Sequence, residues 1–325
     1  MNYIVLDLEW NQNPSPWQKP NKLMPYEIME IGAVKLDEER NELDTFRALI
    51  RPNVYHQIQE NIYQVTHVDY QELKNGRRFS EAARDFLSWC GKDVRFCTWA
   101  KQDLSVLQNN LQYYHLLSLL PGPLLYLDVQ KLFSLCFEDG EVRRSLELAC
   151  DILCLTRESG FHRALSDAIY TGEILRSLKE EYLTGYESLD ITQHPKKGEP
   201  PYRLQSKGRM RLCTPEYPSL RKLLQNKELF SIACPVCERG DLLDRCQEKA
   251  EWFSQSLYTY QCSALCPEHG DLKGKIKIKT GLKGQYFGYK NLSLTSEEEG
   301  KRLALRRKEL AASPTSPGSR PRNMP

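Results

Sequence analysis

The stretch that decides the fold class of this 325-residue chain is Tyr3-Ile4-Val5-Leu6-Asp7-Leu8-Glu9-Trp10. Residues 3–8 form a short apolar run, which is typical of a buried strand in the centre of a sheet. Asp7 and Glu9 flank one residue near the end of this strand. Because side chains at positions i and i+2 of a strand point to the same face, the two carboxylates are expected to project together. A solvated strand end is the ordinary alternative for such a pair.

The segments that follow predict an α/β fold. The further expected strands are 28–36, 45–50, 94–98 and 124–127, and the expected helices are about 80–89, 104–116, 145–153 and 164–178. Another helix is expected from Asp128, whose side chain is predicted to cap it rather than to bind a ligand. Three strands in meander order, then alternating helices and strands, predict a mixed five-stranded sheet flanked by helices.

The composition excludes several classes of protein. With 40% hydrophobic and 27% charged residues, the chain is globular and not wholly disordered. No stretch approaches the roughly 20 apolar residues that a membrane helix needs, so no membrane association is expected. The first residues lack the basic segment of a signal peptide, so we expect a cytoplasmic protein. Its 11 cysteines then indicate buried thiols or metal ligands rather than disulfides.

Charge is distributed unevenly along the chain. Residues 1–180 hold 20 Lys and Arg against 26 Asp and Glu, whereas residues 181–325 hold 25 against 17. An acidic half suggests chemistry that needs carboxylates, and a basic half suggests a polyanionic partner, although ordinary fluctuation is an equal alternative. The expected organisation is an α/β domain at 1–182, a linker at 183–201, a basic β-rich module at 202–292 and a charged tail at 293–325, disordered at its end.

Two further acids and a histidine fall at the ends of predicted elements. Asp103 follows the strand at 94–98, where helix capping is the simplest role. His162 and Asp167 open the last helix of the domain. Five helical steps of about 100° place two side chains about 140° apart, so His162 is expected on the loop or first turn and Asp167 on the helix body.

In order, residue type and spacing, Asp7-x-Glu9, Asp103 and His162-x4-Asp167 resemble the motifs of the DEDDh 3′–5′ exonucleases. The phrases Tyr3-Ile-Val-Leu-Asp-Leu-Glu-Trp, Glu30-Ile-Gly-Ala-Val and His162-Arg-Ala-Leu-Ser-Asp-Ala are most similar to the KapD-like and Eri-like branch. The resemblance covers residues 1–180 and implies a ribonuclease-H-like fold. The chain departs from the commoner pattern after Glu9, where Trp10-Asn11-Gln12 replaces Thr-Thr-Gly.

The resemblance also implies a reaction. It assigns two Mg²⁺ (or Mn²⁺) ions to Asp7, Glu9, Asp103 and Asp167, and it makes His162 the general base. The expected substrate is single-stranded nucleic acid, RNA or DNA, shortened from a free 3′ end to nucleoside 5′-monophosphates. Two ions about 3.5–4 Å apart can stabilise both the attacking and the leaving oxygens of a phosphodiester, and Mg²⁺ prefers carboxylate ligands.

Three apolar side chains near the acids are candidate substrate contacts. Trp10 and Trp99 could stack a terminal base, and Leu8 could wedge against it. For Trp99 the favoured alternative is core packing, and Leu8 could likewise point into the core.

The module at 202–292 carries two close pairs of cysteines, Cys234/Cys237 and Cys262/Cys266. Four thiolates can hold a structural Zn²⁺ tetrahedrally, and the arrangement resembles a zinc ribbon. The second pair has an irregular spacing, so Cys246 or His269 could replace one of its members. Unpaired structural cysteines are the alternative.

Basic residues surround these cysteines. Lysines at 273, 275, 277 and 279 alternate, which places them on one face of a predicted strand. This face could bind phosphates, or it could protect the edge of a sheet. A regulatory or adaptor protein that uses the exonuclease fold for binding is the second functional hypothesis, and its protein partners would be unknown. A binding-only relative would be free to lose the carboxylates, which this chain keeps.

Overall fold

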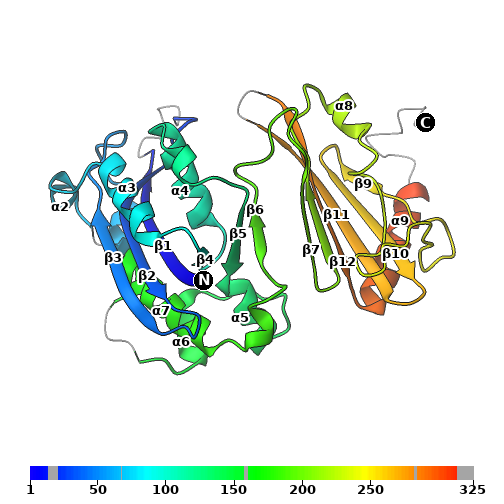
Figure 1. The fold of residues 1–325 in the computed structure, drawn as a ribbon, viewed down its shortest axis with the longest axis horizontal. Helices are drawn as coiled ribbons and strands as arrows, with labels where there is room; N and C mark the ends of the chain where they lie inside the picture. The colour runs from blue at the N-terminus through cyan, green and yellow to red at the C-terminus, as the bar shows by residue number, and fades with distance from the viewer. Residues whose placement is uncertain (14–20, 67, 157–159, 282–283, 313–325) are drawn as a thin grey trace. The chain divides into compact units, whose positions relative to one another are not determined.

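The computed structural model describes residues 1–13, 21–66, 68–156, 160–281 and 284–312 (Figure 1). The chain divides into two compact units, residues 1–193 and 194–325. Each unit is built around its own six-stranded sheet. Among the described residues, no helix is long and apolar enough to cross a membrane.

The sheet of the first unit is mixed, with the order β3-β2-β1-β4-β5-β6. Its strands are β1 (Asn2–Gln12), β2 (Tyr26–Leu36), β3 (Glu42–Leu49), β4 (Val94–Thr98), β5 (Leu124–Asp128) and β6 (Ser188–Asp190). The central strand β1 runs antiparallel to β2 and parallel to β4. The predicted mixed α/β fold is confirmed, but the sheet has one strand more than expected. Residues 188–190, in the predicted linker, pair antiparallel with β5 as an edge strand.

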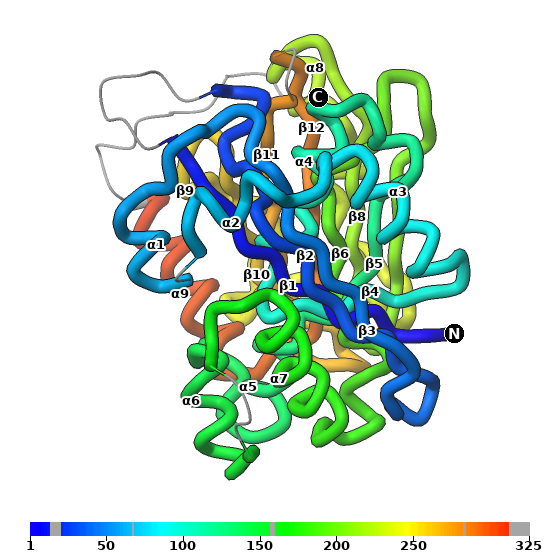
Figure 2. The backbone as a smooth tube through the Cα atoms, turned by 90° about the vertical axis from the view of Figure 1, so that its left-hand side faces the viewer, coloured from blue at the N-terminus to red at the C-terminus, as the bar shows by residue number. Residues whose placement is uncertain are grey.

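Helices cover both faces of this sheet. They are α1 (Glu60–Thr66), α2 (Tyr70–Lys74), α3 (Phe79–Cys90), α4 (Gln102–Tyr113), α5 (Val129–Phe137), α6 (Leu146–Ile152) and α7 (Ala164–Ser177). Even-numbered residues of β1, such as Ile4 and Leu6, pack in one core with residues of α3 and α4. Odd-numbered residues, such as Tyr3 and Val5, pack in a second core with residues of α5, α6 and α7. Figure 2 shows these three helices gathered on the same side of the sheet. The Asp128 carboxylate accepts a hydrogen bond from the Lys131 N–H at the start of α5, so the predicted N-cap is confirmed.

The second unit contains an antiparallel sheet with the order β7-β8-β12-β11-β10-β9. Its strands are β7 (Tyr202–Ser206), β8 (Arg209–Cys213), β9 (Phe253–Ser256), β10 (Thr259–Cys266), β11 (Gly270–Thr280) and β12 (Tyr286–Leu294), and α8 spans Leu220–Leu224. Apolar residues on one face of β11, such as Ile276 and Ile278, pack with Leu223 and Leu229 to form its core.

The charged segment after β12, where the sequence predicts a short helical stretch followed by a disordered end, begins with a helix. Residues Glu297–Ala312 form helix α9, whose Leu303 and Ala304 are buried. The hydroxyl of Ser263 donates a hydrogen bond to the Gly300 carbonyl, which fastens α9 to β10. The predicted disorder at the end of the chain concerns residues 313–325, which lie outside the described residues.

Candidate active site

Three carboxylates from two elements meet in the first unit. Asp7 and Glu9 lie on β1, and Asp167 lies in the first turn of α7. Because both β1 acids are at odd positions, they share the face that α7 covers. One oxygen from each of the three carboxylates lies within 4.8 Å of the others. This is the spacing of groups that can share a bound cation.

Asp103 approaches the same place from the first turn of α4. Its carboxylate accepts a hydrogen bond from the backbone N–H of Leu8 at 3.2 Å, and the residue is only 4% exposed. The N-cap of α4 is Lys101, so Asp103 does not occupy the capping position. The hydrogen bond to the residue between Asp7 and Glu9 fixes a fourth carboxylate beside the pair.

Burial and mutual repulsion disfavour the charged forms of these groups. Burial raises the pKa of Asp7 well above its ordinary value, and the charges of Asp103 and Asp167 raise it further. Burial, with the charge of Asp167 next, raises the pKa of Glu9 to about 8. Burial likewise raises the pKa of Asp103 to about 7 and that of Asp167 to about 6. Clustered carboxylates of this kind favour the binding of cations, which offset their charge.

The sequence reasoning missed a fifth acid, Glu30, next to this cluster. It lies opposite Glu9 in the β1–β2 pairing and is completely buried. Arg47 binds its Oε1 at 2.7 Å, and Arg163 binds its Oε2 at 3.0 Å. One feature of the sequence could have pointed to Glu30: it is a single acid within the apolar run Ile28-Met29-Glu30-Ile31. Buried charges of this type need a partner, which the sequence could not locate.

His162 lies on the loop directly before α7, with a left-handed backbone (φ 66°). Its N–H lies 3.2 and 3.3 Å from the two carboxylate oxygens of Asp167. The imidazole is 46% exposed, and its Nε2 lies 3.5 Å from Oε1 of Glu147. The backbone of His162 is therefore fixed to the acidic cluster, while its ring is accessible to solvent.

A close approach between β2 and α7 sets the position of Asp167. A Cβ atom added to Gly32 would lie 2.1 Å from the backbone of Ala164 and Leu165, at the start of α7. Only glycine leaves room for this contact. Gly32 thus allows α7 to begin directly against the sheet, which brings Asp167 to the β1 acids.

The candidate substrate contacts occupy different environments. Leu8 is 3% exposed and belongs to the core on the α3–α4 side, yet it also lines a pocket beside Glu9. Trp10 lines the same pocket, together with Ile62 and Val65, and meets Tyr26 edge to face at 6.0 Å. Trp99 does not line this pocket. It packs against Phe133 at 6.1 Å on the α5 side, in agreement with a packing role.

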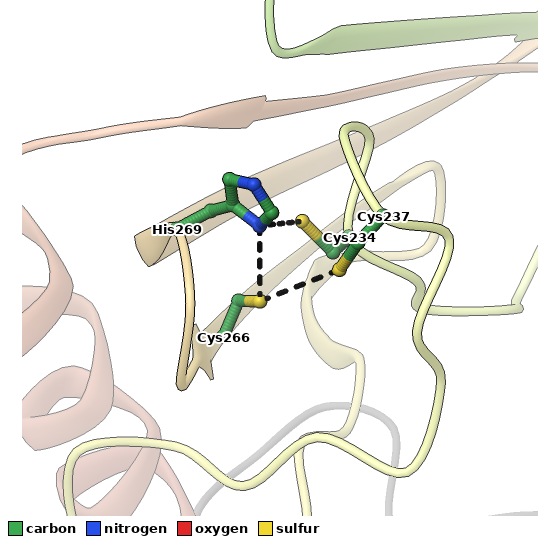
Figure 3. Close-up of side chains that lie close together, drawn as sticks. All are labelled: Cys234, Cys237, Cys266 and His269. Atoms are coloured by element: carbon green, nitrogen blue, oxygen red, sulfur yellow. Dashed lines mark hydrogen bonds between the residues drawn. The ribbon is translucent and has the colours of Figure 1, made fainter.

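The second unit brings together Cys234, Cys237, Cys266 and His269 (Figure 3). The His269 Nδ1 lies 3.7 Å from the sulfur of Cys234 and 3.6 Å from that of Cys266. The sulfurs of Cys237 and Cys266 are 3.7 Å apart. Ligand atoms of a tetrahedral zinc, about 2.0–2.3 Å from the ion, lie about 3.5–3.8 Å from each other. The four side chains therefore fit the shape and the donor chemistry of a structural zinc site.

The expected ligand Cys262 is not part of this cluster, and neither is Cys246. Both Cys262 and Cys266 lie on the unbroken strand β10, where four residues span about 13 Å, too far for one ion. The Cys262 sulfur points towards Gly274 of β11 and is fully buried. His269 takes its place because the turn after β10 returns the chain to Cys266. Of the alternatives expected from the sequence, the structure thus favours His269.

The family model for Exonuclease (RNase_T) matches residues 4–175. This range is more than half of the chain, and it includes the carboxylates of Asp7, Glu9, Asp103 and Asp167. The chain belongs to this exonuclease family. The curated protein "Probable 3'-5' exonuclease KapD" of Bacillus subtilis (strain 168) is 25% identical over 115 residues, which cover 35% of this chain and 54% of that protein. The chain thus spans about half the length of this exonuclease relative.

Solved exonuclease structures are also similar. The nuclease domain of 3'hExo, a DEDDh family member bound to rAMP, matches with a TM-score of 0.46 and 18% identity over 54% of this chain and 90% of that one. E. coli exonuclease I in complex with a dT13 oligonucleotide matches with a TM-score of 0.45 and 14% identity, over 56% of this chain and 42% of that one. The predicted membership of the exonuclease family is confirmed by the family match.

Proposed function

We propose that this protein is a metal-dependent 3′–5′ exonuclease that shortens single-stranded nucleic acid from a free 3′ end. The observation that carries the proposal is the convergence of Asp7, Glu9 and Asp167, with Asp103 beside them, in one cluster of an exonuclease-family fold. Burial and mutual repulsion raise the pKa values of these carboxylates, and bound cations would offset the repulsion.

The donor set suits Mg²⁺ or Mn²⁺. Both ions prefer oxygen ligands, and the cluster offers carboxylates only. Two such ions would supply positive charge to the phosphoryl oxygens and to the leaving 3′-oxygen. The charges of Asp103, Asp167 and Glu9 all act on Asp7, and these four carboxylates would hold the ions. The hydrogen bond from Leu8 keeps Asp103 in place before substrate arrives.

His162 acts as the general base. A neutral imidazole nitrogen can accept a proton from an attacking water, which is the usual role of a histidine base. The hydrogen bond from its backbone to Asp167 holds the residue beside the cluster, and the exposed ring can turn towards the reacting phosphate. Leu8 and Trp10 contact the terminal nucleotide in the pocket beside Glu9. Trp99 keeps a packing role.

The side chains of Cys234, Cys237, Cys266 and His269 would hold a structural zinc ion. Four protein ligands leave no open position, so this site stabilises the second unit and takes no part in the reaction. Its loops have few apolar residues of their own: the local core consists of Cys234, Leu242, Ala250, Ala264, Cys266 and Leu272.

A time course with matched 3′-labelled and 5′-labelled RNA and DNA oligonucleotides tests the proposal. We expect the 3′ label to be released first as a nucleoside 5′-monophosphate when Mg²⁺ or Mn²⁺ is present. Asp7→Ala should abolish release without unfolding the chain. Undiminished release by Asp7→Ala, or in the absence of divalent cations, would refute the site.

A further inference from the structure

Asn11 lies in the stretch Trp10-Asn11-Gln12, where the chain departs from the commoner exonuclease pattern. It is near the end of β1 and is completely buried. Its Nδ2 donates a hydrogen bond to the carbonyl of Gln57 at 2.7 Å, and its Oδ1 accepts one from the N–H of Gln59 at 3.2 Å. Both partners are backbone groups, 46 and 48 residues further along the chain. One amide therefore fastens a distant segment to the strand that carries two of the clustered acids.

The segment 57–59 leads directly into α1. The carbonyl of Gln59 accepts hydrogen bonds from the N–H groups of Ile62 and Tyr63, at 2.9 and 3.0 Å, and these bonds begin the helix. The side chain of Gln59 also accepts a hydrogen bond from the Nε2 of Gln12 at 2.6 Å. Two consecutive residues at the end of β1, Asn11 and Gln12, thus bind the residue that starts α1.

A second buried residue, Glu27 of β2, binds the chain just before this segment. Glu27 lies opposite Asn11 in the β1–β2 pairing and is only 2% exposed. Its carboxylate accepts hydrogen bonds from the consecutive N–H groups of Asn53, Val54 and Tyr55, at 2.6–2.9 Å. Residues opposite each other on neighbouring strands share a face of the sheet, so Asn11 and Glu27 form one polar pair. Together they fix the backbone between residues 53 and 59.

Helix α1 depends on these contacts because it is short and has little core of its own. It has seven residues, of which Thr66 is buried. A helix of this length is marginal without tertiary contacts. Ile62 adds a partly buried contact with a small apolar cluster, whereas Val65 is 46% exposed. The hydrogen bonds at the N-terminal end of α1 therefore matter for its position.

The same helix forms one wall of the pocket beside Glu9. Residues of α1 and of β1 line this pocket from two sides: Asn61, Ile62, Val65 and Thr66 from α1, and Leu8, Glu9, Trp10 and Gln12 from β1. The position of α1 thus decides the width of the pocket. A wall that is already in place saves the free energy that a ligand would otherwise spend on ordering it.

We propose that Asn11 is a positioning residue of the nucleotide pocket, which holds α1 where it can contact the terminal nucleotide opposite Trp10. The inference rests on the proposed function, because that function places the terminal nucleotide in this pocket. Both halves of the Asn11 amide are bound to the segment 57–59, so the residue acts through α1. Its effect is on the binding of the nucleotide, and the cations and the attacking water are left to the carboxylates and His162.

The test compares Asn11→Ala, which removes both hydrogen bonds, with Gln57→Ala. The control lies in the same segment, but the Gln57 side chain is exposed and Asn11 binds only its backbone carbonyl, so this bond remains. A third variant, Asn11→Thr, has a residue that favours strands and whose hydroxyl can keep one of the two hydrogen bonds. Thermal unfolding establishes that the variants are folded, and Asn11→Thr decides the question if Asn11→Ala does not fold.

Calorimetry measures the Kd of adenosine and thymidine 5′-monophosphates in the presence of Mn²⁺, and initial rates give kcat and KM for dT20 and rU20. We expect Asn11→Ala to raise Kd and KM about tenfold, as for a wall that is in place about a tenth of the time. The values of kcat and of Mn²⁺ affinity should change little, because the carboxylates remain. Asn11→Thr should lie between, and Gln57→Ala should match the unsubstituted chain.

Hydrogen exchange at the amides of residues 60–66 gives an independent readout. Exchange should be faster in Asn11→Ala than in Gln57→Ala, because the first turn of α1 loses its link to β1. Equal exchange in the two variants would overturn the inference. So would an unchanged Kd in Asn11→Ala and Asn11→Thr, an equal loss in Gln57→Ala, or a fall in kcat or Mn²⁺ affinity without a rise in Kd.

The nucleotide measurements also separate this inference from the proposed function. If the unsubstituted chain bound the nucleotides but hydrolysed no oligonucleotide, the exonuclease proposal would be contradicted, while the Kd values of the variants would still decide the role of Asn11. If the unsubstituted chain bound neither nucleotide, the inference itself would be overturned.

Discussion

The guanidinium of Arg163 binds the buried carboxylate of Glu30, with Nε 3.0 Å from Oε2. Arg163 occupies the N-cap position of α7, directly after His162, and Glu30 lies opposite Glu9 on the neighbouring strand. One ion pair therefore connects the strand pair that carries two of the clustered acids to the loop that carries the histidine. Its charge also acts on the cluster, because Arg163 opposes the rise in the pKa of Glu9.

Arg163→Ala should therefore reduce activity more than Arg47→Ala, although both arginines bind Glu30. Without Arg163, Glu9 holds its proton more tightly and cations bind less well, so we expect about a tenfold loss of kcat/KM at pH 7, equivalent to about one pKa unit. The loss should diminish as pH rises. Initial rates from pH 6 to 9 check this, and an equal effect of the two substitutions at every pH would contradict it.

His162→Ala should lower the rate of mononucleotide release by about 10²–10⁴-fold, the usual contribution of a general base. Binding of Mn²⁺, measured by calorimetry, should change little, because the carboxylates remain. A large loss of Mn²⁺ affinity would instead make His162 a ligand. Since the histidine ring is exposed, the variant is expected to fold normally.

Stability of the metal-free first unit should fall as pH rises from about 4 to about 8. Burial and mutual repulsion raise the pKa of Glu9 to about 8, of Asp103 to about 7 and of Asp167 to about 6. Unfolded carboxyls titrate near pH 4, so the folded chain binds more protons than the unfolded chain in this window and loses stability through it. Thermal unfolding at pH 5.5 and 8.5 measures the effect.

Addition of Mg²⁺ should stabilise the protein more at pH 8.5 than at pH 5.5, because cation binding must displace protons at the lower pH. Asp167→Asn should weaken both the fall of stability with pH and the pH dependence of the stabilisation by Mg²⁺. A melting temperature that rises with pH in the absence of divalent cations would contradict the raised pKa values.

Gly32→Ala should destabilise the first unit by about 1–3 kcal/mol, as overpacking usually does. The new methyl group would displace the start of α7 and thus Asp167 from the β1 acids, so activity should fall as well. Gly172→Ala is the matched control within α7. Its nearest atoms would lie 3.9 Å away, and alanine favours a helix, so stability should be kept or improved. Similar losses in both variants would be incompatible with this account.

Cys266→Ser should remove bound zinc and destabilise the second unit, whereas Cys262→Ala should keep one equivalent of zinc per chain. His269→Ala should behave like Cys266→Ser, because its Nδ1 contacts two of the cysteine sulfurs. Measuring the zinc content of the purified proteins distinguishes two ligand sets: three cysteines with His269, as in the structure, and four cysteines including Cys262. Loss of zinc from Cys262→Ala, with His269→Ala unaffected, would restore the four-cysteine site.

Local sequence patterns predicted much of the fold and of the candidate active site. The apolar run at 3–8 identified the central strand, and its period of two placed Asp7 and Glu9 on one face. The five-residue step from His162 to Asp167 placed one on the loop and the other on the helix. These are properties of neighbouring residues, and neighbouring residues share a local geometry that is the same in every fold.

Relationships between distant segments were decided by the tertiary structure alone. Pairing across β1 and β2 set Glu30 beside Glu9, and the two arginines that bind it come from β3 and from the start of α7. The straightness of β10 excluded Cys262 from the zinc cluster, and pairing on both sides placed the lysines of β11 inside a sheet. Sequence periodicity tells which way a side chain points along its own element, but which partner it meets depends on packing and hydrogen bonding among segments far apart in the chain.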